Sequence, residues 1–130
     1  MRKTTDIRLV FGGDKELILR GFTDASFQTE RDDFRSQSGF VFFLNGGAVS
    51  WKSFKQSTVD DSTTEAECIA ASEAAKEACW TKKFLIELGV GPDANGPVKL
   101  LCDNNGAIAQ TKEPRAHHKS KHVLRKYHLV

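Results

Sequence analysis

Short apolar runs separated by turn-forming residues dominate the first half of the chain. Residues 7–11 form one run, closed by Gly-Gly-Asp at 12–14, and residues 17–24 form a second, more apolar run. Runs of this length that are bounded by glycine predict β-strands. The sequence therefore predicts a strand that ends at Asp24, and residues 1–16 are expected to form a connector or an edge strand.

Two further apolar runs, residues 38–44 and 48–54, are separated by Asn-Gly-Gly at 45–47. Asparagine and glycine tolerate positive φ and therefore favour tight hairpin turns. We expect these two runs to be antiparallel neighbours. The polar residues 28–37 are expected to form a surface connection to the preceding strand.

Residues 62–88 contain neither glycine nor proline, which is typical of a long α-helix. Ser62 and Glu65 match a capping box, in which the serine hydroxyl accepts from the Glu65 amide and the glutamate reaches back to the amide of the cap residue. Gly89 and Pro92 are expected to end the helix.

A stripe of small apolar side chains follows one face of this helix and should face the sheet. Counted at helical spacing from Glu67, the stripe consists of Ala70, Ala71, Ala74, Ala75, Ala78 and Leu85. Glu67 would then lie in the first turn of the stripe, whereas Glu65 belongs to the cap.

The position of the helix between the third and fourth strands sets the predicted topology. Residues 98–102 form the next apolar run, which ends at Asp103, and helices are predicted over 104–112 and over the basic segment 117–130. A helical crossover brings the fourth strand beside the first in parallel. Asp24 and Asp103 should then lie at the carboxyl ends of neighbouring strands, where open α/β sheets bind ligands.

Length and composition restrict the class of protein. A chain of 130 residues with 39% hydrophobic residues fits a single domain with a modest core. The net charge of +2 argues against a polycationic tail but allows a local basic patch. No apolar run approaches the ~18 residues of a membrane span, and the first residues lack a secretory signal. We therefore expect an intracellular protein, cytoplasmic or nuclear, without a membrane partner.

The cysteines and histidines do not match known metal motifs. Cys68, Cys79 and Cys102 are widely spaced and lack C-x-x-C pairing, so they predict neither a zinc site nor a disulfide framework. His118 and His122 have no glutamate between them in the H-E-x-x-H sense. We expect the cysteines to be small buried apolar residues.

Three carboxylates, those of Asp24, Glu67 and Asp103, are expected to converge. Unpaired carboxylates at the edge of a core carry a desolvation penalty, which a divalent cation would offset. Oxygen ligands suit magnesium or manganese, and two such ions can activate water and stabilise the leaving oxygen of a phosphodiester. The pattern favours metal-dependent phosphodiester hydrolysis, although an aspartate before a loop is also common as a turn or cap residue.

Several motifs occur in order along the chain. They are FTDAS at 22–26, RSQSGF at 35–40, VSWKS at 49–53, STTEAE at 62–67, ASEAAKE at 71–77, CDNNGAI at 102–108 and SKHVLRKYH at 120–128. Together, from about residue 7 to the end of the chain, they resemble the ribonuclease H domain of plant copia-type retrotransposon polyproteins.

The resemblance implies an α/β, ribonuclease H-like fold, a mixed sheet of strand order 3-2-1-4-5 with a long helix packed on it. Strands 1–3 would be antiparallel and strand 4 parallel to strand 1. It also implies hydrolysis of the RNA strand of an RNA/DNA hybrid with two magnesium ions. The family's first aspartate, helix glutamate and second aspartate correspond to Asp24, Glu67 and Asp103. A reverse transcriptase domain of the same polyprotein is a further implied partner.

The chain departs from the family pattern at its last residue, Val130. Family members continue through a fifth strand and a final helix with a fourth metal-binding aspartate, to which no residue here corresponds. We expect a single domain, 1–130, without these elements, a weakened metal position, and an open edge at residues 98–102. The alternative function is therefore a catalytically silent remnant that binds nucleic acid or forms a homodimer, through this edge or an exchanged terminal helix.

Two groups of side chains are candidates for contact with nucleic acid. Thr63, Thr64, Asn104 and Asn105 flank the acids and could hydrogen-bond sugar or phosphate groups, including the 2′-hydroxyl. Helix capping explains Thr63 and Asn104 equally well. Basic residues near the chain end could contact phosphates, and a solvated helix face explains them equally well. These basic candidates are Lys119, Lys121, Arg125 and Lys126.

Overall fold

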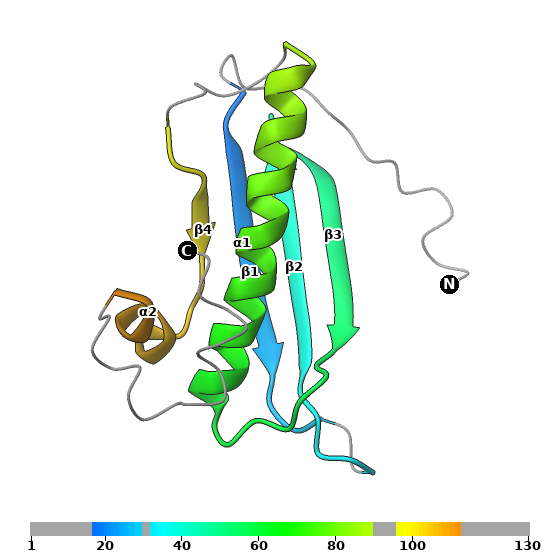
Figure 1. The fold of residues 1–130 in the computed structure, drawn as a ribbon, viewed down its shortest axis with the longest axis vertical. Coiled ribbons are helices and arrows are strands. Elements are labelled where there is room, and N and C mark those ends of the chain that lie inside the picture. Colours follow the sequence, from blue (N-terminus) through cyan, green and yellow to red (C-terminus); the bar gives the residue numbers. More distant parts are fainter. Residues whose placement is uncertain (1–16, 30–31, 90–95, 113–130) are drawn as a thin grey trace.

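The computed structural model describes residues 17–29, 32–89 and 96–112, in which a long helix covers one face of a four-stranded sheet (Figure 1). The elements are β1 (Leu19–Ser26), β2 (Gln37–Leu44), β3 (Gly47–Lys55), α1 (Thr63–Glu87), β4 (Lys99–Leu101) and α2 (Asn105–Lys112). The sheet order is β3-β2-β1-β4, with β1, β2 and β3 antiparallel neighbours and β4 parallel to β1. The predicted α/β class and mixed sheet are therefore confirmed. The predictions for residues 1–16 and 117–130 lie outside the described residues.

Strand β1 is shifted towards the carboxyl end relative to the prediction. It begins at Leu19 and continues past Asp24 to Ser26, because Ala25 and Ser26 still pair with β2. The predicted strand end at Asp24 is therefore wrong by two residues. Asp24 lies inside a paired strand, opposite Gly39, and its backbone is fixed by the sheet.

The hairpin between β2 and β3 is confirmed. Asn45 and Gly46 have φ angles of 51° and 77°, and Leu44 pairs with Gly47. Two consecutive residues with positive φ match the right-handed twist of a two-residue hairpin. Gly47 thus begins β3 rather than belonging to the turn.

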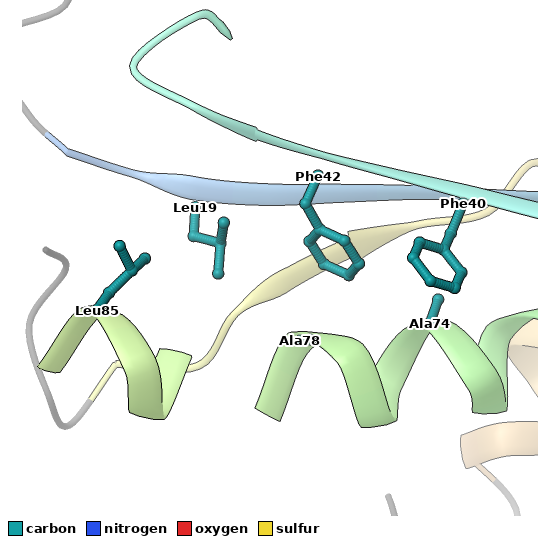
Figure 2. Packing of buried hydrophobic residues seen from close by; sticks show 6 residues of the cluster. All are labelled: Leu19, Phe40, Phe42, Ala74, Ala78 and Leu85. Carbon is teal, nitrogen blue, oxygen red and sulfur yellow. The ribbon is translucent and has the colours of Figure 1, made fainter. Parts of the chain in front are cut away.

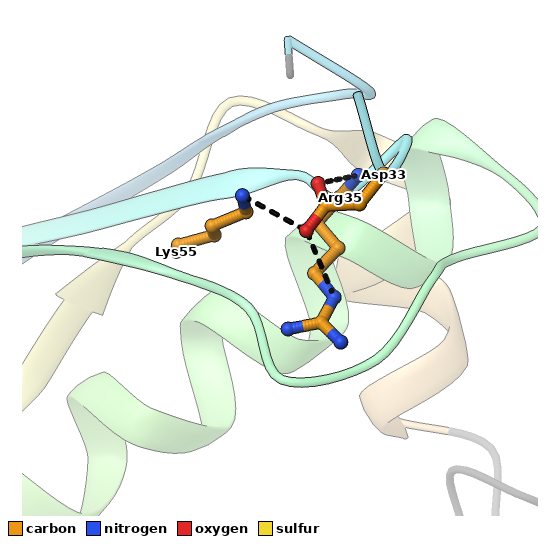
Figure 3. A network of polar contacts seen from close by, with 3 residues as sticks. All are labelled: Asp33, Arg35 and Lys55. Carbon is orange, nitrogen blue, oxygen red and sulfur yellow. Dashed lines mark hydrogen bonds and ion pairs between the residues drawn. The ribbon is translucent and has the colours of Figure 1, made fainter. Parts of the chain in front are cut away.

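The connection between β1 and β2 is held by a small charged network (Figure 3). The Asp33 carboxylate accepts from Lys55 Nζ at 2.9 Å and from the Arg35 backbone amide at 3.4 Å, and Arg35 Nε lies 3.4 Å away. The hydrogen bond from Lys55 is the main cause that lowers the pKa of Asp33. Asp32 and Phe34 are exposed, as expected for a surface connection.

Helix α1 begins with a cap close to the predicted one. The Glu65 amide donates to Ser62 Oγ at 3.2 Å, but the Glu65 carboxylate accepts from the Asp61 amide at 2.9 Å, not from the amide of Ser62. The helix ends at Glu87, and Gly89, two residues later, has a φ of 66° that is typical of glycine after a helix. Although α1 is 25 residues long, no helix within the described ranges is apolar enough to span a membrane.

The hydrophobic core lies between α1 and the sheet (Figure 2). Leu19, Phe40 and Phe42 from the strands pack against Ala74, Ala78 and Leu85 of the helix. Small alanine side chains let the helix axis approach the sheet, and the two phenylalanine rings fill the space between them. Of the predicted stripe, Ala71 and Ala75 are only half-buried, because they lie at the margin of the contact.

The cysteines have three different environments. Cys68 is buried, Cys102 is half-buried and Cys79 is exposed, and all three are free thiols. The prediction that they are small buried residues is therefore wrong for Cys79, which lies one position beyond the buried stripe at Ala78.

The side chains of Phe42 and Leu100 lie so close to Gly21 that a substitution there tests the packing of the core. A methyl group on Gly21 would collide with the Phe42 ring and lie 2.8 Å from Leu100 Cδ1. Residues of β1, β2 and β4 therefore meet at this point. We expect Gly21→Ala to lower the free energy of unfolding by about 1–3 kcal/mol, measured by chemical denaturation. Gly39→Ala on β2 is the matched control, because its added carbon would lie 3.6 Å from the Lys52 carbonyl oxygen. Equal destabilisation of the two variants would contradict the packing described here.

Candidate metal centre

The register of the two parallel strands aligns the two predicted aspartates. Phe22 of β1 pairs with Leu101 of β4. Asp24 and Asp103 each lie two residues further along the chain, so their backbones lie near each other at the carboxyl ends of these two strands. This confirms the predicted neighbouring positions of the two residues, which the parallel pairing requires.

Glu67 of α1 lies between the ends of these strands. Its side chain is 6% exposed, and its Oε1 accepts from the Ala25 amide at 3.2 Å. Its Oε2 lies 3.7 Å from the thiol sulfur of Cys102. Ala25 follows Asp24 and Cys102 precedes Asp103, so one buried carboxylate joins both strand ends to the helix.

Three side chains provide ligand atoms that lie within 4.8 Å of one another: Glu67, Cys102 and Asp103. Asp24 does not belong to this group. Its side chain is exposed, like those of Arg20 and Phe22, whereas the alternate residues Gly21 and Thr23 are buried. The geometry thus brings Glu67 and Asp103 together and leaves the Asp24 carboxylate at the margin.

Negative charge accumulates at this edge of the sheet. Burial is the main cause that raises the pKa of Glu67, and the carboxylates of Asp24 and Asp103 raise it further, against the lowering effect of the Ala25 amide. Burial likewise raises the pKa of Cys102, with contributions from Glu67 and Asp103. A cation would relieve both effects. The carboxylate oxygens fit magnesium or manganese.

The sequence does not predict that Cys102 is part of this cluster, because no second cysteine stands at a metal-binding spacing. The available signal was its position directly before Asp103, at the end of a strand that faces Glu67.

The polar candidates around the acids have different roles in the fold. Asn104 caps α2, since its Oδ1 accepts from the Ala107 amide at 2.9 Å, which confirms the capping interpretation for this residue. Thr63 is the exposed first residue of α1, and the cap is Ser62, so the capping interpretation is wrong for Thr63. Thr64 faces the start of α2, where a methyl group on Gly106 would lie 3.1 Å from its hydroxyl oxygen.

Asn105 is exposed at the first position of α2. The basic candidates Lys119, Lys121, Arg125 and Lys126 lie outside the described residues.

Comparison with known proteins reveals relatives among transposon polyproteins. Over all 130 residues, the chain is 42% identical to the retrovirus-related Pol polyprotein from transposon TNT 1-94 of Nicotiana tabacum, and it spans 10% of that protein. It is 33% identical over 114 residues to the Pol polyprotein from transposon RE2 of Arabidopsis thaliana, covering 88% of this chain and 8% of the relative.

A shorter protein also matches part of the chain. The secreted RxLR effector protein 161 of Plasmopara viticola is 44% identical over 78 residues, which is 60% of this chain and 54% of that protein. No family model matches the chain. The chain is thus similar to a small segment of plant retrotransposon Pol polyproteins, along its whole length for the tobacco relative and over 88% of it for the Arabidopsis relative.

The raised pKa of Glu67 predicts how metal and pH affect stability. Ionisation of Glu67 costs more in the folded state than in the unfolded state. The free energy of unfolding is therefore highest below the unfolded-state pKa of this group and falls as the pH rises through the higher folded-state pKa. We expect Glu67→Gln to raise the melting temperature at pH 7 in the presence of a chelator, and the difference to shrink at acidic pH. Magnesium should stabilise the wild-type chain more than the variant.

Thermal denaturation followed by circular dichroism measures both effects. Glu73→Gln is the matched control on the same helix, because Glu73 forms a surface pair with Lys76 at 2.6 Å. An unchanged melting temperature of Glu67→Gln at pH 7 without metal would contradict the unfavourable charge at this position.

Proposed function

We propose that the chain is the ribonuclease H domain of a plant copia-type retrotransposon polyprotein, and that it hydrolyses the RNA strand of RNA/DNA hybrids. The similarity to Pol polyproteins supports a function derived from a retroelement. The mixed sheet with order β3-β2-β1-β4 and a helix across it is consistent with the ribonuclease H-like fold. The proposal extends to residues 1–130 as one domain.

The observation that carries the proposal is the position of the Glu67 carboxylate. It is fixed by the Ala25 amide at 3.2 Å and lies beside Cys102, so it joins the strand ends that carry Asp24 and Asp103. The carboxylates of Asp24 and Asp103 are both near enough to raise the pKa of Glu67. A bound divalent ion would supply water activation and stabilisation of the leaving oxygen.

Each acid has a different task in this mechanism. Glu67, held by the Ala25 amide and by burial, provides a fixed oxygen ligand at the base of the site. Asp103 is exposed next to it and can contact an ion while the scissile backbone approaches. Asp24 is exposed on the neighbouring strand, and rotation of its side chain would bring its carboxylate towards the same ion, because its backbone adjoins the amide that Glu67 accepts from.

The residues around the acids would position the hybrid. Thr63 and Asn105 are exposed at the starts of α1 and α2, which contact each other. Their side chains are available to sugar and phosphate groups on either side of the acids, including the 2′-hydroxyl that distinguishes RNA from DNA. Thr64 and Asn104 would hold the two helix starts in this arrangement.

A catalytically silent, interacting domain is the second candidate function. The observation that favours it is the exposed orientation of Asp24, outside the group formed by Glu67, Cys102 and Asp103. Within the described residues, β4 pairs only with β1, so its other edge is available to a second copy or to a neighbouring domain of a polyprotein.

Cleavage of a labelled RNA/DNA hybrid in the presence of magnesium tests the proposed activity. We expect the wild-type chain to cleave the RNA strand, and Asp24→Asn to reduce the rate at least about 100-fold, equivalent to about 2.7 kcal/mol of transition-state stabilisation. Asp32→Asn, on an exposed loop residue, is the matched control and should cleave like the wild type.

The alternatives give different results in the same assay. Equal cleavage by the wild type and Asp24→Asn would mean that another site or a contaminant is responsible. No cleavage by any of the three folded proteins would favour the silent domain.

A further inference from the structure

Two polar side chains between β3 and α1 are buried with unpaired oxygen atoms. Asp60 and Gln56 are each 1% exposed. Within the described residues, neither carboxylate oxygen of Asp60 has a hydrogen-bond partner, and the same holds for the amide oxygen of Gln56. Buried polar atoms are almost always hydrogen-bonded in folded proteins, so an unpaired one requires an explanation, such as a bound ion. Three unpaired oxygens in one short segment therefore point to a ligand.

Ser36 lies next to both side chains. The Gln56 backbone amide donates to the Ser36 carbonyl oxygen at 2.9 Å. The Ser36 hydroxyl lies near enough to Asp60 to affect its ionisation, although it forms no hydrogen bond to either carboxylate oxygen. Ser36 is fully buried and directly precedes β2, and Gln56 directly follows β3. Ser36, Gln56 and Asp60 therefore form one buried group, the Asp60 cluster, at the ends of these two strands.

The orientation of the Gln56 amide is fixed by its nitrogen. Its Nε2 donates to Ser38 Oγ at 2.6 Å and to the Ala66 carbonyl oxygen at 2.9 Å, which uses both amide hydrogens. Rotation of the amide by half a turn would place its oxygen against the Ala66 carbonyl, where two acceptors repel each other. Oε1 is therefore held in place as an acceptor that needs a donor or a cation.

The electrostatic environment of Asp60 favours a cation. Burial is the main cause that raises the pKa of its carboxyl; the Ser36 hydroxyl lowers this pKa, and the carboxylates of Glu65 and Asp61 raise it further. The charged groups among the described residues that shift this pKa are thus both acidic. The Glu65 amide at the start of α1 donates to Ser62 and does not compensate the charge. A buried charge without a counterion is strongly unfavourable.

A proton or a water molecule satisfies the cluster less completely than a cation. A proton on Asp60 gives the carboxyl one donor, which can join two of the three unpaired oxygens. One water molecule has two hydrogens and can also donate to two of them. A cation has no such limit, because it can contact both carboxylate oxygens of Asp60 and the Gln56 amide oxygen together.

We propose that Asp60 and Gln56 bind a calcium ion, with the Ser36 hydroxyl and water as further ligands. Calcium accepts carboxylate, amide and hydroxyl oxygens in a flexible geometry, whereas magnesium requires a nearly octahedral one and retains much of its water. These ligand groups include no sulfur or imidazole, which soft ions such as zinc favour.

The consequence of this site is structural. The ion would join the ends of β2 and β3 to the segment that leads into α1, and Gln56 extends this link to the Ala66 carbonyl in the first turn of the helix. Glu67 follows Ala66, so the ion would stabilise the turn that positions the candidate metal centre. Asp60 does not belong to the group formed by Glu67, Cys102 and Asp103. Calcium binding at the Asp60 cluster therefore does not rest on the proposed function.

Calcium binding to the full chain tests the proposal after the candidate metal centre has been disabled. The parent is the double variant Glu67→Gln, Asp103→Asn, which keeps the Asp60 cluster intact. We expect equilibrium dialysis with radioactive calcium to find one equivalent bound to this parent. Asp60→Asn and Asp60→Ala should each weaken binding at least about tenfold, as loss of a ligand requires.

Asp61→Asn is the matched control in the same parent, because it removes an exposed carboxylate next to Asp60. It should weaken binding less than about threefold, since water and salt screen an exposed charge. The proposal would be overturned by a folded parent that binds no calcium, by unchanged affinity in folded Asp60→Asn or Asp60→Ala, or by an equally large loss in Asp61→Asn.

Thermal denaturation distinguishes the ion from a proton on Asp60. We expect calcium to raise the melting temperature of the parent at pH 7 relative to a chelator, and to leave that of Asp60→Asn unchanged. A melting temperature of the parent that depends on pH but not on calcium would show that Asp60 is protonated and would refute the ion site. Both measurements use a chain without two of the three proposed catalytic carboxylates, so their outcome is independent of hybrid cleavage by the wild type.

Discussion

The parallel pairing of β1 with β4 is the constraint on which the rest of the molecule depends. It requires a crossover, and α1 provides it across the face of the sheet. The pairing has only three residues in register, from Arg20 with Lys99 to Phe22 with Leu101. Its stability therefore comes from packing, with Phe42 and Leu100 closing over Gly21 and the alanines of α1 lying against the strands. The same packing fixes where Glu67 meets the two strand ends.

Burial and charge oppose each other at that meeting point. Glu67 is surrounded by protein, and the carboxylates of Asp24 and Asp103 add to the cost of its ionisation, which one amide hydrogen bond only partly offsets. A site with these properties stores unfavourable electrostatic energy in the absence of a cation, as functional sites often do. The half-buried Cys102 thiol lies 3.7 Å from Glu67 Oε2 and donates to it.

Within residues 17–29, 32–89 and 96–112, the sequence was sufficient to predict the elements and their order, because each depends on local signals. The Asn45–Gly46 turn, the Ser62 cap and the alanine stripe are examples, and the helix between the third and fourth strands predicted the parallel pair. Details that depend on three-dimensional contacts could not be predicted. Glu65 bonds the Asp61 amide instead of Ser62, and Cys79 lies just outside the buried face. Strand β1 also continues past Asp24 to Ser26, which depends on pairing with β2.

The central claim is that Asp24, Glu67 and Asp103 hold a divalent ion together at one edge of the sheet. Anomalous X-ray diffraction from crystals of the chain grown with manganese tests it most directly. The account predicts an anomalous peak between the Glu67 and Asp103 carboxylates, with the Asp24 side chain rotated towards it. Ordered carboxylates without a peak at saturating manganese, or a peak with Asp24 directed to the opposite face of the sheet, would contradict it.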